Sequence, residues 1–361
     1  MTVRACRFDQ VIPAIIEHDA VSNHTFEAQR LLREMGFHSE IFASIIGPGT
    51  IGRVRPIDEL VDGGPEHWLL YQCSIGSPVA DRFGAHSGPK VLDYHNITPA
   101  ELVERWIPPL GAESRLGRAQ LSKLATKVDG SFADSAFNAD ELTAFGFADP
   151  TVVPVLIEAA NHEIEPSPAA LERLGRTTGS KWLFVGQVAP HKAQHDIVTA
   201  FAAYRALFDP TAQLWLVGRE MGHGYRSAIE RYLKSLGILD AVEMPGSVPA
   251  EVLAAYFDAA DLFVCLSDHE GFCAPIVEAM ARGLPVVGYA VAAVPSTVGG
   301  AGVLIDEKDP LLVASVAHEL LSDRAARDEL VARGRVRAGE LSLDAARSAF
   351  RSAIARLMSR A

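Results

Sequence analysis

The stretch 267-SDHEGFCAPIVEAMARGLPVV-287 contains a turn, a helix and the start of a strand, and it follows the apolar segment 262-LFVCL-266. Pro275 suits the first turn of a helix, where its missing N–H has no partner to lose, and Gly283 suits the position just past the end. We therefore expect a helix over 274–282 between two buried strands. A strand, a helix and a second strand form the unit from which parallel sheets are built.

The same alternation continues along the whole chain and falls into two sets. Besides a helix expected over 24–36, the apolar segments are 10–16, 38–43, 68–72, 90–94, 129–134 and 151–157 in the first half, and 182–186, 214–218, 241–246, 262–266, 285–289 and 302–305 in the second. Strands that alternate with helices predict parallel sheets covered by helices on both faces. We therefore expect an α/β fold with two Rossmann-like domains.

The boundaries of these domains follow from composition. The segment 161–180 is polar, contains prolines and ends in Thr-Thr-Gly-Ser, which indicates a linker. It separates an N-terminal domain over 1–160 from a C-terminal domain over 181–340, and 341–361 is expected to form an amphipathic C-terminal helix. In open parallel sheets, ligands bind beyond the carboxyl ends of the strands, so the expected site is the cleft between two such domains.

Composition and charge exclude several classes of protein. With 361 residues, 48% hydrophobic and 22% charged, the chain has the composition of a folded two-domain protein. Its net charge of -12 argues against general binding to nucleic acid, which requires a surplus of Lys and Arg. No apolar run approaches the ~20 residues of a membrane span, and the N-terminus lacks a signal-peptide pattern, so we expect a cytoplasmic protein. The 4 cysteines include no C-x-x-C pair, which argues against a zinc site or a disulfide framework.

Two acidic side chains of the opening stretch are candidates for ligand binding. Glu270 precedes the expected helix, and Glu278 lies about one turn inside it among apolar residues. The free amides of 271–274 and the positive end of the helix dipole suit an anion. Because the residues around Glu278 are apolar, its carboxylate has few polar neighbours in the helix. We therefore expect it to hold a ligand such as paired ribose hydroxyls. The structural alternative is that Glu270 caps the helix and Glu278 is a solvated surface acid.

The chain resembles the retaining glycosyltransferases of family 4, the glycosyl transferases group 1, which have the GT-B fold. The resemblance is carried by 184-FVGQVAPHK-192, 216-LVGRE-220, 245-PGSVPAEVLAAYFDAADLFV-264, 269-HEGFCAPIVEAMARGLPVVGY-289 and 295-PSTVGGAGVLIDEKDP-310, and more loosely by 92-LDYHNITPAE-101 and 133-ADSAFNADEL-142. It implies two Rossmann-like domains that face a cleft, with the C-terminal helix crossing back to the N-terminal domain.

The resemblance also implies roles for residues around the acid pair. Glu270 would lie by the hydroxyls of the donor sugar, and Glu278 would hold the ribose. The backbone amides of Gly271, Phe272 and Cys273 would meet the sugar and the phosphates. Family members more often have Gly where Cys273 stands, so the function of its side chain stays open.

The predicted phosphate side lies at the end of the strand 182–186. Gly186 ends this strand, and the resemblance implies that Lys192 neutralises the donor diphosphate together with an Arg directly after the Gly. That Arg is replaced here by Gln187, which donates hydrogen bonds but carries no charge. Arg219 could supply the missing charge. The structural alternatives are a solvated Lys192 and a surface ion pair between Arg219 and its neighbour Glu220.

The predicted acceptor side lies at strand ends of the first domain. His95 and Asn96 follow the strand 90–94, and the resemblance suggests that His95 contacts the sugar, although a lone histidine can also be structural. Further candidates for acceptor binding are Gly76 in the loop 71–78 and the residues that replace a Gly-rich loop after the first strand, namely Asp19, Ser22 and Asn23.

A predicted helix over 115–128 has an apolar face and a basic face. Arg115, Arg118, Lys123 and Lys127 form the basic face, close in sequence to Trp106. Such a helix either packs on the domain or contacts an anionic membrane that carries a lipid-linked acceptor, which would place the protein peripherally at the inner face of the membrane.

These observations predict a retaining glycosyltransferase that uses a GDP-, UDP- or ADP-sugar and a saccharide, lipid-linked or small-molecule acceptor. Glu270, Lys192 and His95 are the expected catalytic residues. No cofactor is expected, and no metal, because the sequence lacks the Asp-x-Asp on which the other glycosyltransferase architecture depends. The nicotinamide oxidoreductases are excluded by the missing G-x-G-x-x-G after the first strand. The alternative function is a degenerate transferase, altered at Gln187, that acts as a binding subunit of a glycosylation complex.

Overall fold

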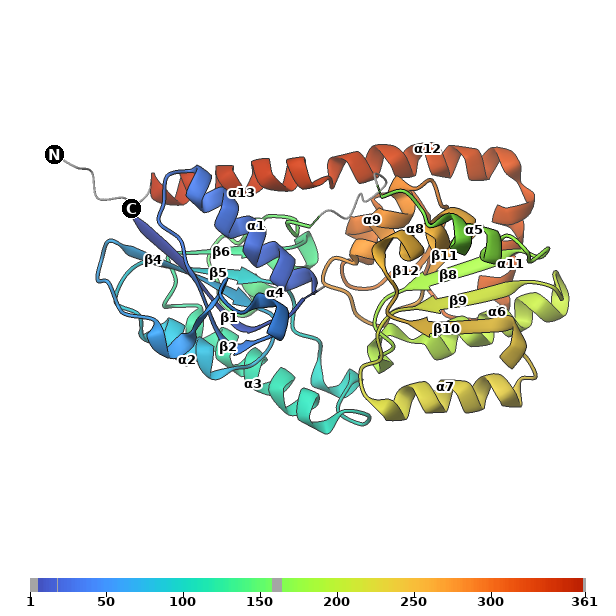
Figure 1. The fold of residues 1–361 in the computed structure, drawn as a ribbon, viewed down its shortest axis with the longest axis horizontal. Coiled ribbons are helices and arrows are strands. Elements are labelled where there is room, and N and C mark those ends of the chain that lie inside the picture. Colours follow the sequence, from blue (N-terminus) through green and yellow to red (C-terminus); the bar gives the residue numbers. More distant parts are fainter. Residues whose placement is uncertain (1–5, 18, 158–163, 360–361) are drawn as a thin grey trace. The chain divides into compact units, whose positions relative to one another are not determined.

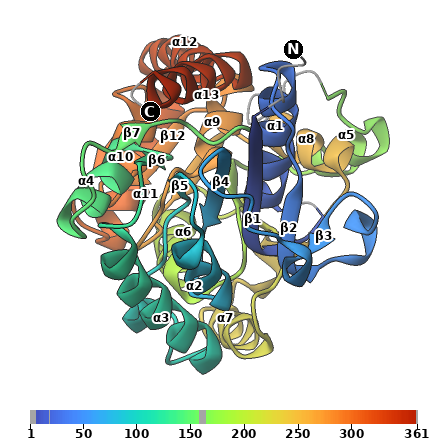
Figure 2. The same cartoon turned by 90° about the vertical axis from the view of Figure 1, so that its left-hand side faces the viewer.

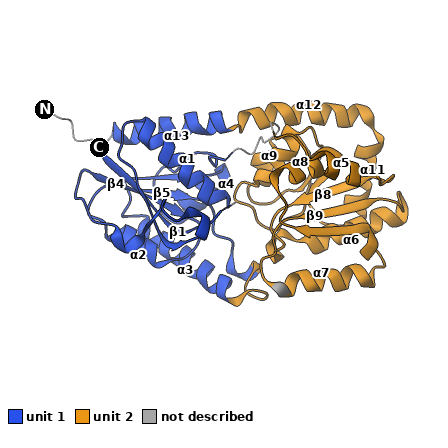
Figure 3. Cartoon of the chain, viewed as in Figure 1, with its two compact units in different colours: residues 1–101, 109–158, 343–361 blue, residues 102–108, 159–342 orange. Residues whose placement is uncertain are grey.

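The computed structural model of the chain describes residues 6–17, 19–157 and 164–359, and its fold consists of two compact units (Figure 3). Unit 1 comprises residues 1–101, 109–158 and 343–361, and unit 2 comprises residues 102–108 and 159–342. The C-terminal segment is therefore part of the unit that the N-terminal half forms. This confirms the predicted return of the C-terminal helix to the N-terminal domain.

Unit 1 is built on a 7-stranded parallel sheet with the strand order β3-β2-β1-β4-β5-β6-β7. The strands are β1 (Arg7–Ile15), β2 (Ile41–Ile46), β3 (Arg55–Pro56), β4 (His67–Cys73), β5 (Lys90–Tyr94), β6 (Gly130–Ala133) and β7 (Thr151–Val152). The helices are α1 (Ala20–Glu34), α2 (Pro78–Ala85), α3 (Pro108–Leu124), α4 (Ala136–Ala144) and α13 (Leu343–Met358).

The central strands of this sheet are covered on both faces. β4 is buried at every position, as expected for a central strand of a parallel sheet that is covered on both faces. Trp68 and Leu70 pack with α1 and with Phe350 of α13, whereas Leu69 and Tyr71 pack with α2, α3 and α4. Figures 1 and 2 show α1 and α13 on one side of this sheet and α2 and α3 on the other. Because β1, β4, β5 and β6 are parallel neighbours, their carboxyl ends lie at the same edge of the sheet.

Unit 2 is built on a 6-stranded parallel sheet with the order β10-β9-β8-β11-β12-β13. The strands are β8 (Lys181–Val185), β9 (Gln213–Val217), β10 (Val242–Gly246), β11 (Leu262–Cys265), β12 (Val286–Tyr289) and β13 (Val303–Ile305). The helices are α5 (Pro168–Leu174), α6 (Gln194–Leu207), α7 (His223–Ser235), α8 (Ala250–Ala259), α9 (Ala274–Ala281), α10 (Val294–Val298), α11 (Pro310–Ser322) and α12 (Arg324–Glu340).

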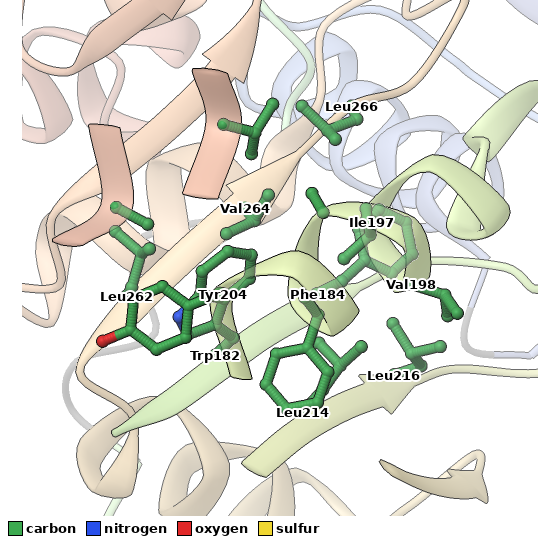
Figure 4. Close-up of a cluster of buried hydrophobic side chains, with 14 of the residues drawn as sticks. Trp182, Phe184, Ile197, Val198, Tyr204, Leu214, Leu216, Leu262, Val264 and Leu266 are labelled. Atoms are coloured by element: carbon green, nitrogen blue, oxygen red, sulfur yellow. The ribbon is translucent and has the colours of Figure 1, made fainter. Parts of the chain in front are cut away.

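Alternate side chains of β8, β9 and β11 gather on one face of this sheet and pack against α6 (Figure 4). They are Trp182, Phe184, Leu214, Leu216, Leu262 and Val264, in contact with Ile197, Val198 and Tyr204 of α6. Residues of α7 and α11 complete this core, while α8 and α9 lie on the other side of the sheet (Figure 1). Because both faces are covered, ligands have access to the sheet only at the strand ends.

Two of the differences between the structure and the sequence-based expectations lie between residues 151 and 180. Of the predicted strand 151–157, only Thr151–Val152 forms β7, since Pro154 has no N–H to continue the ladder. The predicted linker 161–180 contains α5, whose N-cap Ser167 accepts a hydrogen bond from Ala170 N–H. The predicted domain boundary at 160–161 lies outside the described residues.

Candidate active site

The loops that follow β8 and β9 run side by side at the carboxyl edge of the unit 2 sheet. Val188 N–H donates to Arg219 O at 2.9 Å. A Cβ at Gly218 would lie 2.0 Å from Gly186 O, so this close approach requires glycine. Gln187 is half-buried and the Arg219 side chain is exposed. The two residues predicted to meet the diphosphate therefore lie on neighbouring loops.

Lys192 and Glu270 form a shielded ion pair between the loops that follow β8 and β11. Lys192 ends a short 3-10 helix (Pro190–Lys192), and its Nζ lies 2.7 Å from Glu270 Oε2. The two side chains expose only 19% and 6% of their surfaces. Burial by itself would lower the pKa of Lys192, but Glu270 outweighs this effect and raises it. A lysine charge is therefore held at the strand ends.

Helix α9 begins beside this ion pair and has no side-chain cap. Its N-cap residue, Cys273, adopts the left-handed conformation with φ 66°. Within the described ranges, the N–H groups of Gly271, Phe272 and Cys273 donate to no other protein group. Free amides at the positive end of a helix dipole bind anions. The start of α9 thus lies beside the Lys192–Glu270 ion pair at this edge of the sheet.

Glu278 lies in α9 between residues that are buried. Ile276, Val277, Ala279 and Met280 pack into unit 2, and Glu278 itself is half-buried. It lines a small pocket with Leu253 and Phe257 of α8 and with Arg282. Burial raises the pKa of Glu278 to about 7, and Arg282 opposes the rise. Glu278 is therefore a carboxyl group poised between its neutral and ionised forms near neutral pH.

Asp268, the first acid of the opening stretch, has a structural partner. Lys308 Nζ forms an ion pair with Asp268 Oδ1 and lies 3.0 Å from Asp196 Oδ2. Asp268 N–H also donates to His191 O at 2.8 Å. These contacts fasten the loop after β11 to its neighbours and give Asp268 a structural role.

His95 lies at the carboxyl end of β5 in unit 1, and both of its ring nitrogens face acceptor atoms. Nδ1 lies 3.0 Å from Asp134 Oδ1, and Nε2 lies 2.6 Å from Gln72 Oε1. The Gln72 amide is oriented by Gln10, because Gln72 Nε2 donates to Gln10 Oε1 at 2.8 Å. Gln10 Nε2 in turn donates to Thr25 O at 3.0 Å. An imidazole that donates from both nitrogens is the protonated, positively charged form.

A second imidazole, that of His24, lies beside His95 and accepts a hydrogen bond at one ring nitrogen. The ring centroids of His24 and His95 are 4.6 Å apart. His24 Nδ1 accepts from Leu156 N–H at 2.9 Å, and its Nε2 lies 3.0 Å from Asp93 Oδ2. Burial by itself would lower the pKa of His95, but Asp134 and Asp93 outweigh it and raise the pKa to about 9. The positive charge is therefore on His95, and neither ring offers a free lone pair to a metal.

The residues of the first loop of unit 1 mainly support the loop itself. The Asp19 carboxylate caps α1, since it accepts from the N–H and the hydroxyl of Ser22 at 3.0 Å each. Ser22 Oγ accepts from Ile16 N–H at 3.0 Å. Asn23 is exposed and lines a pocket of about 800 Å³ along α1, whose lining includes none of the other predicted acceptor residues.

Asn96 and Gly76 also have local structural roles. Asn96 adopts φ 71°, and its Nδ2 donates to Asn138 Oδ1 at 2.9 Å. Gly76 packs against α3, where an added Cβ would lie 2.3 Å from Glu113 O. Gly76 therefore permits the close approach of its loop to a helix.

The basic face predicted on 115–128 is smaller than expected. Arg118 turns inward, because its guanidinium donates to Ile97 O at 3.0 Å and lies 2.7 Å from Glu141 Oε1. Arg118 therefore contributes less to the predicted basic face than its position in the sequence indicated. Trp106 is 43% exposed, and its ring packs edge-on against Tyr225 at a centroid distance of 5.3 Å. None of the described helices combines the length and apolar character that crossing a bilayer requires.

Sequence reasoning missed the two residues that contact the ring nitrogens of His95. Asp134 directly follows β6 (Gly130–Ala133), and Gln72 lies in β4 beside β5. Asp134 follows a strand end just as His95 does, so the strand-end rule that selected His95 could have selected it. Gln72 gives no such signal, because it lies inside a strand.

The fold of the whole chain is GT-B, the architecture of a large class of glycosyltransferases. Sucrose-phosphate synthase from Thermosynechococcus elongatus superposes with a TM-score of 0.75 at 18% identity and covers 98% of this chain and 100% of that one. Alr3699/HepE of Anabaena in complex with UDP-glucose superposes with a TM-score of 0.76 at 15% identity, covering 97% and 99%. At these identities the comparison establishes the fold.

Comparison of sequences shows the family. Residues 172–337 match the model of the Glycosyl transferases group 1. A D-inositol 3-phosphate glycosyltransferase of Thermobifida fusca (strain YX) is 31% identical over 307 residues, which are 80% of this chain and 68% of that protein. The enzyme of the same name from Thermobispora bispora is 32% identical over 272 residues, which are 71% of this chain and 61% of that protein. The chain belongs to the glycosyl transferases group 1 and is a glycosyltransferase.

Proposed function

We propose that this chain transfers a hexosyl group from a nucleotide-diphosphate sugar to a hydroxyl acceptor, with retention of configuration and without a metal ion. The observation that supports this most is the Lys192–Glu270 ion pair beside the uncapped start of α9. A fixed ammonium and free amides at the carboxyl ends of parallel strands are suited to a diphosphate.

Donor binding would rearrange the ion pair. Lys192 would turn from the Glu270 carboxylate to the diphosphate, and Glu270 would accept a hydrogen bond from a hydroxyl of the donor sugar. Both side chains are shielded, so their electrostatic interactions are stronger than at an exposed surface. Glu278 would hold the ribose hydroxyls. Gln187 and Arg219, on neighbouring loops, are the remaining candidates for contact with the phosphates.

The same charges would promote departure of the leaving group. Transfer passes through an oxocarbenium-like state, and the nucleoside diphosphate departs with the bonding electrons. Lys192 and the amides of Gly271, Phe272 and Cys273 would stabilise its developing charge. The leaving phosphate would accept the proton of the acceptor hydroxyl on the same face of the sugar, which gives retention without a protein nucleophile. The absence of Asp-x-Asp from the sequence supports metal independence.

His95 would act through its charge. Both ring nitrogens already face acceptors, and its pKa of about 9 keeps it protonated at neutral pH, so it is a poor general base. We assign it an electrostatic and positioning role on the acceptor side. For the acceptor we propose a saccharide, a lipid-linked sugar or a small polyol. D-inositol 3-phosphate is the first compound to test, because relatives at 31% and 32% identity are named for it.

The test is turnover by the purified chain with a panel of GDP-, UDP- and ADP-sugars in the presence of EDTA. We expect one donor class to release its nucleoside diphosphate and to yield a glycosylated acceptor by mass spectrometry, and Lys192→Ala to abolish the reaction. Lys181→Ala is the matched control, because Lys181 lies at the opposite end of β8. If a donor binds but is neither transferred nor hydrolysed, the chain is a binding subunit and the proposed reaction is wrong.

A further inference from the structure

Two buried cysteines lie beside the Lys192–Glu270 ion pair, and the proposed reaction uses neither thiol. Cys265 ends β11 and Cys273 precedes α9, and their Sγ atoms are 3.8 Å apart. Both cysteines are free thiols. A carboxylate oxygen of Glu270 lies within 4.8 Å of both sulfur atoms. Two thiols and a carboxylate therefore converge at one point of the donor site.

Cys273 keeps its side chain at a backbone position that favours glycine. Its φ of 66° and ψ of 65° lie in the left-handed region, which is unfavourable for a non-glycine residue. The side chain does not offset this cost by capping α9. Its contact with Cys265 is therefore the feature that calls for an explanation.

The spacing of the two sulfur atoms matches a tetrahedral zinc site. A Zn–S bond of about 2.3 Å at the tetrahedral angle separates two sulfur ligands by about 3.8 Å. A carboxylate oxygen is an accepted third ligand, and water or a phosphate oxygen can complete the coordination. Thiolates select Zn²⁺ or Cd²⁺ over Mg²⁺ and Mn²⁺, which prefer oxygen. This donor set thus suits a thiophilic ion and not the hard cations of other glycosyltransferases.

We propose that Cys265, Cys273 and Glu270 bind one thiophilic divalent cation such as Zn²⁺, and that the bound ion inhibits the transferase. Coordination requires thiolates, so each protonated thiol releases its proton to solvent as its sulfur binds the ion. When the Glu270 carboxylate binds the ion, it no longer pairs with Lys192 and cannot accept a hydrogen bond from the donor sugar. The inhibition rests on the proposed donor site, whereas the binding of the ion does not.

The binding test is a titration of the reduced protein with Cd²⁺, followed by the ultraviolet thiolate-to-cadmium charge-transfer band and by calorimetry. We expect one equivalent to bind to the wild type. Cys265→Ser should weaken Cd²⁺ binding at least a hundredfold. Loss of a residue that only hydrogen-bonds to a metal ligand already lowers metal affinity by about 10–100-fold, and loss of a ligand itself is more severe. Cys273→Ser should show the same loss. Cys73→Ser is the matched control, since Cys73 is also buried and also ends a strand. Thermal unfolding verifies that each variant is folded.

The inhibition test compares Zn²⁺ titrations of transferase activity in the wild type and in Cys265→Ser. We expect the variant to keep its activity and to lose the inhibition. Failure of Cd²⁺ to bind the wild type, or equal binding by Cys265→Ser, would overturn the site whether or not the chain is a transferase. Binding without loss of activity would overturn the inhibition.

Discussion

Replacement of Glu278 by Gln should remove a pH dependence from nucleotide binding. Burial raises the pKa of Glu278 to about 7, against the effect of Arg282. Ribose hydroxyls donate to a carboxylate, so the nucleotide should bind the ionised form of Glu278 and its affinity should rise with pH. The glutamine has no proton to lose, and its carbonyl oxygen can still accept one hydrogen bond.

The size of the effect follows from the pKa. With a pKa of about 7, the ionised fraction of Glu278 is about 30-fold smaller at pH 5.5 than at pH 8, and the affinity of the wild type should change by the same factor. The titration of the diphosphate itself contributes equally to both proteins. The ratio of wild-type to Glu278→Gln affinity should therefore rise about 30-fold across this range.

The same group should also affect folding stability with a defined sign. The folded protein raises the pKa of Glu278 from 4.5 to about 7, so it binds more protons than the unfolded chain between these values. Stability from this group is present below pH 4.5 and is lost as the pH rises through 7. The loss corresponds to about 3 kcal/mol, and urea unfolding of Glu278→Gln should not show it.

The assay is calorimetric titration of nucleoside diphosphate from pH 5.5 to pH 8, with each point near pH 6.5 repeated in buffers of different ionisation enthalpy. The wild type should release a proton on binding that Glu278→Gln does not release. Glu319→Gln, an exposed acid on α11, is the control. An identical pH dependence and identical proton release in wild type and Glu278→Gln would refute the placement of the ribose at Glu278.

Other substitutions test the remaining parts of the account. Gln187→Arg should tighten nucleoside diphosphate binding by about tenfold to a hundredfold if the new guanidinium reaches the phosphates, whereas unchanged affinity would mean that this loop does not meet them. Asp134→Asn should lower the free energy of unfolding of unit 1 most below pH 6.5, and this loss should shrink as the pH rises towards 9, where His95 loses its charge. Urea unfolding measures this loss, and a loss that does not change with pH would argue against a protonated His95. Phe350→Ala should cost about 3–5 kcal/mol, because this side chain of α13 is fully buried on unit 1, and a cost below about 1 kcal/mol would show that α13 is not part of its core. Transferase activity should be unaffected by EDTA, and a loss that Mg²⁺ or Mn²⁺ restores would exclude the metal-independent mechanism.

Much of the fold could be predicted from the sequence, because most of the parallel strands are apolar runs between helices. The helix expected over 274–282 is found at Ala274–Ala281, with Pro275 in its first turn and Gly283 after its end. The linker over 161–180 was less predictable, since its polar composition concealed the N-cap Ser167 and the helix that follows.

Long-range partners account for what the sequence could not reveal. Lys192 and Glu270 are 78 residues apart, and nothing near either residue identifies the other as its partner. His95 was selected because it follows a strand, but its charge depends on Asp134 and Gln72, which only the sheet order brings to it. The pairing of Cys273 with Cys265 likewise depends on how the loop after β11 turns into α9.

The anomeric configuration of the reaction product tests the central claim most directly. The purified chain would be incubated in EDTA with the nucleotide sugar that it turns over and with D-inositol 3-phosphate or another accepted acceptor, while proton NMR follows the anomeric signals. The account predicts a new glycoside with the same anomeric configuration as the donor, released together with one nucleoside diphosphate per transfer. A product of inverted configuration, or a donor that stays intact with every acceptor, would contradict it.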